Sequence, residues 1–227
     1  MKTNIVVTGA AGFIGGQTAL KLKAYGYQVI GIDQNPCPDR LKDAFYQFVQ
    51  SDVVDLPSQA AIMHARPPAI IHCAGSSLVG PSLANPSDYY ENNVFKTMQL
   101  MDYMRRVLPD TRIIFSSSAA TYGEPVMSPC HEVDPCDPLS PYGESKLISE
   151  RMLAAYYKAY KLDYVAFRYF NATGADPEAR HGQEPGATHI IARVLESIRD
   201  NKQFTLNGVD YPTEDGTCVR DYIHTHR

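Results

Sequence analysis

The chain is 227 residues long, and its 44% hydrophobic and 20% charged residues are typical of a packed globular protein. This length allows one large domain with a smaller lobe rather than two equal domains. The 21 basic and 25 acidic residues give a net charge of −4, and no Lys/Arg run offers a surface for nucleic acid. No apolar stretch reaches about 18 residues and no secretion signal is recognisable, so we expect a cytoplasmic protein without a membrane anchor.

The five cysteines occur at irregular spacing, which is untypical of a disulfide framework, and we expect reduced thiols. Cys130-His131 together with Cys136 could be imagined as metal ligands. This segment is a proline-rich loop, however, and its spacing is not that of a Cys-x-x-Cys site. We therefore predict no metal.

The chain begins with a pattern typical of a βαβ unit. β-branched and apolar residues predict a strand over 3–8, a glycine-rich turn follows, and a helical pattern of apolar residues begins at Phe13. A second apolar run over 28–33 ends in the carboxylate of Asp33, about 20 residues after the glycines.

Strands and helices then continue to alternate. Further strands are predicted near 45–49 and over 69–73, 112–115 and 164–168, and further helices after Pro57 and over about 86–107 and 142–160. Parallel strands need crossover connections, and these place helices on both faces of the sheet. The sequence therefore predicts an α/β fold with a Rossmann-type, doubly wound parallel sheet.

The regular alternation ends near Asn171, where the sequence becomes polar and rich in Gly and Pro. We predict a Rossmann domain over 1–170 and an incomplete, smaller lobe over 171–227, with a helix over about 188–200 and a short strand over 204–206. No cap or turn accompanies the last residues, Thr225-His226-Arg227, so we expect this lobe to be unfinished.

The first turn has glycines at Gly9, Gly12 and Gly15, the spacing G-x-x-G-x-x-G. Such glycines allow a tight turn, close approach of a pyrophosphate to the backbone, and close packing of helix on strand. The glycines alone are weak evidence, but an opening strand before them and Asp33 after them predict dinucleotide binding. A carboxylate at Asp33 accepts ribose hydroxyls and repels a 2′-phosphate, which favours NAD over NADP.

A second pattern predicts catalysis. Tyr142 and Lys146 are four residues apart on an expected helix and therefore share a face. The Lys146 ammonium favours ionisation of the Tyr142 phenol, which makes a tyrosinate base possible near neutral pH. Ser118 follows a central strand and could hydrogen-bond the same substrate hydroxyl, whereas Ser116 and Ser117 better suit a capping role. This arrangement beside a nicotinamide is typical of hydride transfer at a carbinol carbon.

With these motifs in place, the chain resembles the extended short-chain dehydrogenases/reductases and, among them, the UDP-glucose 4-epimerases. The matching stretches run through nearly the whole chain. Beyond the glycines they are His72-Cys73-Ala74-Gly75 through Val79-Gly80, Tyr89-Tyr90-Glu91-Asn92-Asn93-Val94, Ser116-Ser117-Ser118-Ala119 with Tyr122-Gly123, Ser140-Pro141-Tyr142-Gly143 with Ser145-Lys146, Arg168-Tyr169-Phe170-Asn171, and Tyr211-Pro212-Thr213-Glu214-Asp215-Gly216-Thr217 with Val219-Arg220-Asp221-Tyr222-Ile223-His224.

The resemblance implies NAD-dependent interconversion of UDP-galactose and UDP-glucose through a 4-keto sugar, by a protein that is a homodimer at full length. It implies three kinds of site residue. Catalysis is assigned to Ser118, Tyr142 and Lys146; NAD binding to Gly9, Gly12, Phe13, Ile14, Gly15, Asp33, Asp52, Val53, Ala74, Gly75, Asn92, Ser116, Tyr142, Lys146 and Tyr169; and UDP-sugar binding to Ser118, Tyr142, Asn171, His189 and Arg220.

Alternatives remain at this stage. Dehydratases of related fold carry an Asp-Glu pair after the central Ser or Thr, and Ala119-Ala120 in its place disfavours them. Epimerisation of a related UDP-sugar, such as UDP-GlcNAc/GalNAc or UDP-arabinose, is a second alternative. A third is an NAD-binding chain with impaired turnover, because the expected lobe is unfinished. The plainer interpretation of His189 is a residue at a helix start.

Overall fold

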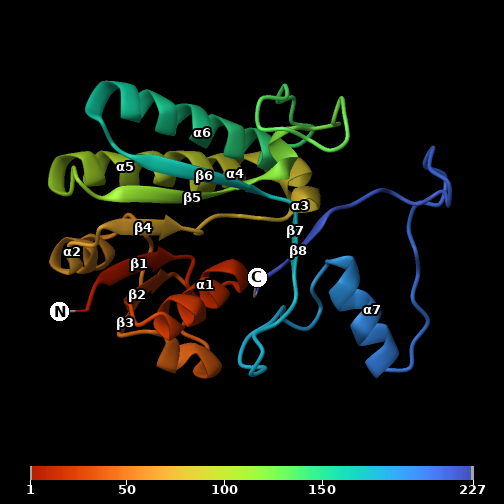
Figure 1. Cartoon of the computed structure of the whole chain (residues 1–227), viewed down its shortest axis with the longest axis horizontal. Coiled ribbons are helices and arrows are strands. Elements are labelled where there is room, and N and C mark those ends of the chain that lie inside the picture. Colours follow the sequence, from red (N-terminus) through yellow and green to blue (C-terminus); the bar gives the residue numbers. More distant parts are fainter. Residues whose placement is uncertain (1, 226–227) are drawn as a thin grey trace.

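The computed structural model describes residues 2–225 and has one large parallel sheet and one small one (Figure 1). The large sheet has the strand order β3-β2-β1-β4-β5-β6 with every pair parallel. Its strands are β1 (Asn4–Thr8), β2 (Gln28–Asp33), β3 (Gln47–Gln50), β4 (Ala69–His72), β5 (Arg112–Ser118) and β6 (Tyr164–Tyr169). This order and direction confirm the predicted Rossmann-type sheet.

Helices cover both faces of this sheet. They are α1 (Phe13–Ala24), η1 (Asp39–Ala44), α2 (Leu56–Ala65), α3 (Val79–Ala84), α4 (Pro86–Tyr89), η2 (Tyr90–Phe95), α5 (Lys96–Val107), η3 (Ala119–Thr121) and α6 (Pro141–Tyr160). Apolar residues of α1 and η1 pack with Ile5 and Val7 of β1 in one core, whereas α2, α5 and α6 pack with Val6 in the other. Alternate residues of β1 thus serve opposite faces, as strand geometry requires.

Several predicted bounds need correction. Strand β5 continues to Ser118, because Ser116 to Ser118 pair in register with the end of β6. The single helix expected over 86–107 is divided into α4, the π-helical turn η2 and α5. A π turn inserts a residue into the helical ladder and is frequent at functional sites. The 3₁₀ helix η1 and the short helix α3 were not predicted.

The region after β6 holds a two-stranded parallel sheet, β7 (Asn171–Thr173) with β8 (Tyr222–His224), and helix α7 (Ile190–Arg199). The strand predicted over 204–206 is wrong: these residues form no strand. Strand propensity is realised only against a partner, and this stretch pairs with none.

The boundary at residue 170 stays a prediction, and His226 and Arg227 of the predicted ending lie outside the described residues. Over residues 2–225, no helix combines the length and apolar character needed to span a membrane.

The last residue of β4 is a buried histidine, His72. His72 is 1% exposed, with Nδ1 2.7 Å from the Thr8 hydroxyl and Nε2 3.0 Å from the Thr97 hydroxyl. These two contacts link β4 to β1 and to α5. Burial, with a smaller contribution from Lys146, lowers the His72 pKa from 6.5 to about 3. The ring is therefore neutral at physiological pH.

This buried ring predicts acid sensitivity. Below pH 6.5 His72 binds a proton in the unfolded chain, whereas in the folded chain it binds one only near pH 3. The free energy of unfolding therefore decreases as the pH falls from 6.5 toward 3. Between pH 7.5 and 4.5 the wild type should lose about 3 kcal/mol more unfolding free energy than His72→Gln. Urea titrations at both pH values measure the difference. His64→Gln, at an exposed position, is the control, and equal pH slopes for wild type and His72→Gln would contradict the prediction.

Candidate active site

A cleft of about 1200 Å³ lies at the carboxyl ends of the strands. It opens beside β1 and β4, where the chain changes the direction in which it adds strands to the sheet, and this is the usual ligand position in open α/β sheets. All fifteen residues predicted to bind cofactor line it. So do Ser118 and His189 from the predicted substrate set.

The glycine turn forms the cleft edge at the start of α1. Gly9 has a φ of +66°, and a Cβ there would lie 2.7 Å from the Ala74 nitrogen and the Cys73 carbonyl carbon. A Cβ on Gly15 would collide with the Gly9 carbonyl. Gly12 caps α1 without a side chain. The first N–H groups of α1 have no partner within the helix, so this end is suited to an anion.

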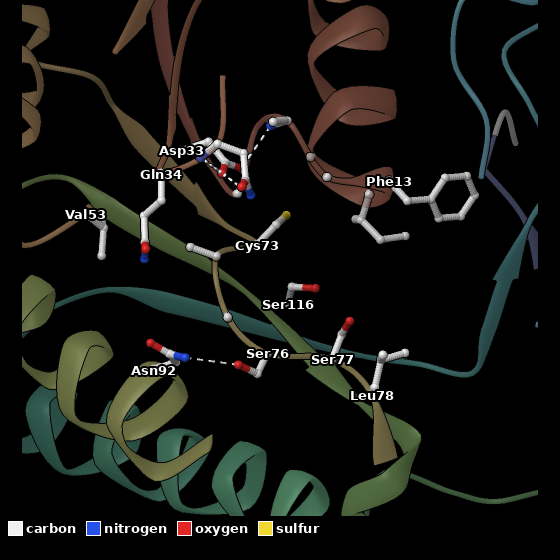
Figure 2. A pocket seen from close by; sticks show the side chains of 18 of the residues that line it. Phe13, Asp33, Gln34, Val53, Cys73, Ser76, Ser77, Leu78, Asn92 and Ser116 are labelled. Atoms are coloured by element: carbon white, nitrogen blue, oxygen red, sulfur yellow. Dashed lines mark hydrogen bonds between the residues drawn. The ribbon is translucent and has the colours of Figure 1, made fainter. Parts of the chain in front are cut away.

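Asp33 lies at the end of β2 and is held by backbone donors (Figure 2). Its Oδ2 accepts from the Ala11 backbone nitrogen at 3.0 Å. Its Oδ1 accepts from the Asn35 backbone nitrogen at 2.9 Å and from the Asn35 side-chain Nδ2 at 3.1 Å. Since each carboxylate oxygen accepts about two hydrogen bonds, Oδ2 retains capacity for one more donor. The Asp33 carboxylate is thus oriented before any ligand arrives.

Asp52 at the same end of the cleft has a partner that the sequence analysis missed. Lys96 Nζ lies 2.7 Å from Asp52 Oδ2, and the Gln34 amide donates to the same oxygen at 2.9 Å. The Lys96 and Asp52 side chains are only 19% and 16% exposed. The signal was present, because Lys96 follows the predicted site residue Asn92 by four positions in the expected helix.

Two neighbouring asparagines of η2 hold the segment 74–78 that follows β4. The Asn92 amide donates to the Ser76 hydroxyl at 3.1 Å (Figure 2). Asn93 is 1% exposed: its Oδ1 accepts from the Ser76 nitrogen at 2.7 Å, and its Nδ2 donates to the Ser76 carbonyl at 3.0 Å and to the Ser145 hydroxyl at 2.9 Å. Asn93 therefore connects the cleft lining to α6, a role the sequence analysis did not assign.

Tyr142, Lys146 and Ser118 all line the cleft, and Ser118 is hydrogen-bonded to Tyr142. Pro141 and the Ser140 hydroxyl, which accepts from the Gly143 nitrogen at 3.2 Å, begin α6 just before Tyr142. Lys146 is 5% exposed, and its Nζ donates to the Ser116 carbonyl at 2.9 Å. The predicted catalytic residues are thus brought together, and their roles stay predictions.

The electrostatics differ from the expectation for a lysine-activated phenol. Burial raises the Tyr142 pKa, and the hydrogen bond with Ser118 is the interaction that lowers it. Burial also lowers the Lys146 pKa to about 8. Both groups are therefore shifted toward their neutral forms, because an apolar environment penalises charge. The lowering influence expected from Lys146 comes instead from Ser118, and burial outweighs it.

The serines of β5 also divide their roles differently from the prediction. Ser118, not Ser116 or Ser117, is the capping residue, because its hydroxyl accepts from the Ala120 nitrogen at 3.1 Å. The Ser117 hydroxyl donates to Glu150, which also pairs with Arg168 at 2.7 Å. Tyr169 at the end of β6 lines the cleft, and burial raises its pKa to about 12.

Two predicted substrate residues do not line the cleft. The Asn171 amide donates to the Asp221 carbonyl at 2.8 Å, which joins β7 to the start of β8. Arg220 is exposed, and its guanidinium donates to the neighbouring Val219 carbonyl at 3.0 Å. No group of three or more His, Cys, Asp or Glu side chains within residues 2–225 could hold a metal ion.

The strand order and the glycine turn define a Rossmann-type protein with a cleft at the switch point of its sheet. Residues 5–226 match the NAD dependent epimerase/dehydratase family. The chain belongs to this family.

Named relatives agree. The chain is 44% identical to a UDP-glucose 4-epimerase from Halalkalibacterium halodurans, covering 97% of this chain and 66% of the relative. It superposes with a TM-score of 0.89 and 41% identity on the UDP-glucose 4-epimerase from Brucella ovis in complex with NAD, covering 98% of this chain and 69% of that one. It is 28% identical, with a TM-score of 0.83, to a UDP-N-acetylglucosamine 4-epimerase from Methanobrevibacter ruminantium M1 in complex with UDP-N-acetylmuramic acid, covering 99% and 70%. The chain thus spans about two thirds of the length of these relatives.

The contacts of Asn93 predict a stability effect. Asn93→Ala removes the partners of the part-buried Ser76 nitrogen and carbonyl and breaks the buried link to Ser145, which should lower the unfolding free energy by about 2–4 kcal/mol. Asn92→Ala is the matched control, because Asn92 makes one contact, to a side chain. It should cost under about 1 kcal/mol. Urea unfolding of the two variants measures both values. Equal losses would contradict the prediction that the additional hydrogen bonds of Asn93 stabilise the fold.

Proposed function

We propose that the chain binds NAD in the cleft and acts in the 4-epimerisation of a UDP-sugar, with UDP-galactose and UDP-glucose as the pair interconverted. The observation that carries this proposal is the convergence of Tyr142, Lys146 and Ser118 on the same cleft as the glycine turn and Asp33. Family membership and the names of the relatives support it.

The cleft residues fit a dinucleotide. The contacts a Cβ would make at Gly9 and Gly15 show that no larger residue suits this turn, which leaves backbone N–H groups at the surface for a pyrophosphate. Asp33 keeps one acceptor position for a ribose hydroxyl, and its charge disfavours a 2′-phosphate. Bound NAD supplies the reversible hydride acceptor that a route through a 4-keto sugar needs.

The chain's own residues supply the proton chemistry. In its phenolate form Tyr142 takes the proton of the sugar 4-hydroxyl, and Ser118, hydrogen-bonded to Tyr142, holds that hydroxyl in line with the phenolate oxygen. The Lys146 ammonium, anchored on the Ser116 carbonyl, stabilises the Tyr142 phenolate that this step requires and so offsets the effect of burial on the phenol. On the sugar side, we propose that Asn171, His189 and Arg220 contact the UDP-sugar. Arginine suits phosphate because its guanidinium donates two hydrogen bonds at once.

A second candidate function is NAD binding with little or no turnover. The placement of Asn171 and Arg220 away from the cleft favours it, because neither side chain is arranged for a ligand there. Epimerisation of an N-acetylated UDP-sugar is the other alternative. An assay of the purified chain with UDP-galactose and with UDP-N-acetylglucosamine, alongside its NAD content, separates the three.

Replacement of Tyr142 tests the base. Tyr142→Phe removes only the ionisable oxygen, so UDP-galactose turnover should fall about 10²–10⁴-fold while NAD binding persists. Tyr157→Phe is the control on the same helix, because Tyr157 is 48% exposed and lies outside the cleft. Coupled detection of UDP-glucose measures turnover. Wild-type rates in Tyr142→Phe would remove this residue from the mechanism.

Replacement of Asp33 tests cofactor choice. Asp33→Ala deletes both the ribose acceptor and the charge that repels a 2′-phosphate, so NAD affinity should fall by about tenfold or more while NADP affinity falls less or rises. Calorimetric titration with each cofactor gives the two dissociation constants. The control is Asp39→Ala at the cleft rim, where the side chain is paired with Lys42. An equal loss for both cofactors in Asp33→Ala would count against the assignment.

A further inference from the structure

The segment 174–189 crosses from β7 to α7 and forms part of the cleft wall. Gln183, Glu184, Ala187 and His189 of this segment line the cleft together with the glycine turn. A segment that shares a cleft with the first turn of α1 can enclose a ligand there only if it is attached to the sheet domain. The attachment centres on one residue, His181.

The His181 side chain is buried against the start of α1. The residue is 3% exposed, and its Nε2 lies 3.1 Å from the Phe13 carbonyl and 3.3 Å from the Gly12 carbonyl. Its own carbonyl accepts from the Gln17 amide at 2.7 Å. His181 thus contacts α1 through both its side chain and its backbone, more than 160 residues away in sequence.

The neighbours of the ring determine its proton. The Arg40 guanidinium of η1 lies with Nε 3.4 Å from His181 Nδ1, and a guanidinium can only donate. Nδ1 must therefore accept, so the ring is neutral and Nε2 carries the hydrogen that it donates to the Phe13 carbonyl. Arg40 also pairs with Glu184, the other charged group near the ring. Burial, and then Arg40, lowers the His181 pKa, which agrees with a neutral ring.

The His181 ring packs closely against α1 at Gly16. A Cβ on Gly16 would lie 2.6 Å from His181 Nε2 and 2.7 Å from Leu41 Cδ1, so α1 needs a glycine at this position for the ring to dock. The Phe13 ring lies 6.2 Å from the His181 ring, centroid to centroid. Gly16 directly follows Gly15 of the glycine turn, so the docking point and the proposed pyrophosphate site share one helical turn.

We propose that His181 is a positioning residue that fastens the segment 174–189 to the first turn of α1, so that a dinucleotide bound in the cleft is enclosed and dissociates slowly. This inference rests on the proposed binding of NAD. A ligand that leaves past the segment must wait for these hydrogen bonds to break, and such contacts act mainly on the dissociation rate.

The test compares dissociation rates of NADH from the full chain, followed by the loss of its fluorescence on dilution into excess NAD. His181→Ala should release NADH about tenfold faster or more, a change that corresponds to about 1.4 kcal/mol. His181→Gln keeps an N–H donor near the position of Nε2 and should restore most of the retention. His64→Ala, which removes an exposed histidine of α2, is the control and should match the wild type.

The outcomes separate the inference from the proposed function. A wild type that binds neither NADH nor NAD overturns the proposed function and the inference with it. Binding by the wild type with equal release rates from wild type and His181→Ala overturns the inference alone. A lower melting temperature of His181→Ala without faster release from the folded fraction also overturns it, because it shows a purely structural role.

A measurement on the unaltered chain applies even if His181→Ala does not fold. Trypsin cleaves after Arg180, within the fastened segment, and after Lys202, beyond α7. NAD should slow cleavage after Arg180 several-fold more than cleavage after Lys202, because a closed segment must open before it is cut. Equal slowing at both positions overturns the inference.

Discussion

The close approach of α1 to the ends of β1 and β4 is the constraint on which the cleft depends. A Cβ on Gly9 would collide with the backbone at Cys73 and Ala74, and one on Gly15 would collide with the Gly9 carbonyl. With glycine at both positions, the start of α1 sits directly over two adjacent central strands. The helix end that attracts anions therefore faces the strand ends that carry Asp33 and Ser116.

Buried polar groups then fix the cleft floor. His72 links Thr8 to Thr97, and Asn93 links Ser76 to Ser145. Each is nearly inaccessible to water, so each hydrogen bond is costly to leave unmade and specifies one arrangement of strand and helix. Burial also shifts the Tyr142 and Lys146 pKa values in the directions that favour the neutral forms of these residues. Burial thus acts both on the hydrogen bonds of the cleft floor and on the protonation of the residues predicted to be catalytic.

Periodicity in the sequence predicted the large sheet and its order of elements, because strands and helices alternate regularly and the central strands β1 and β2 are almost wholly buried and mainly apolar. Periodicity failed at 204–206, where the predicted strand has no partner strand. It also failed at η2, because a single π-helical turn leaves the helical spacing of apolar residues in the sequence unaltered. Motif spacing predicted the glycine turn and Asp33, and the family resemblance implied most of the other residues predicted to bind cofactor; all of them line the cleft. Motif spacing missed Asn93 and His181, because each acts through contacts with residues distant in sequence that no local pattern encodes.

The predicted NAD site and the predicted UDP-sugar site differ in how many of their residues lie together in the structure. Residues from the glycine turn to Tyr169, together with the fastened segment up to His189, already line one cleft. Asn171 and Arg220 belong instead to β7 and the stretch before β8, and helix α7 between them buries none of its residues. The residues predicted to bind the cofactor and two of those predicted to bind the sugar nucleotide therefore lie in separate parts of this chain. The proposed reaction at C4 requires the sugar to be held within a fraction of an ångström, so the proposed turnover places a stricter demand on the structure than the proposed cofactor binding does.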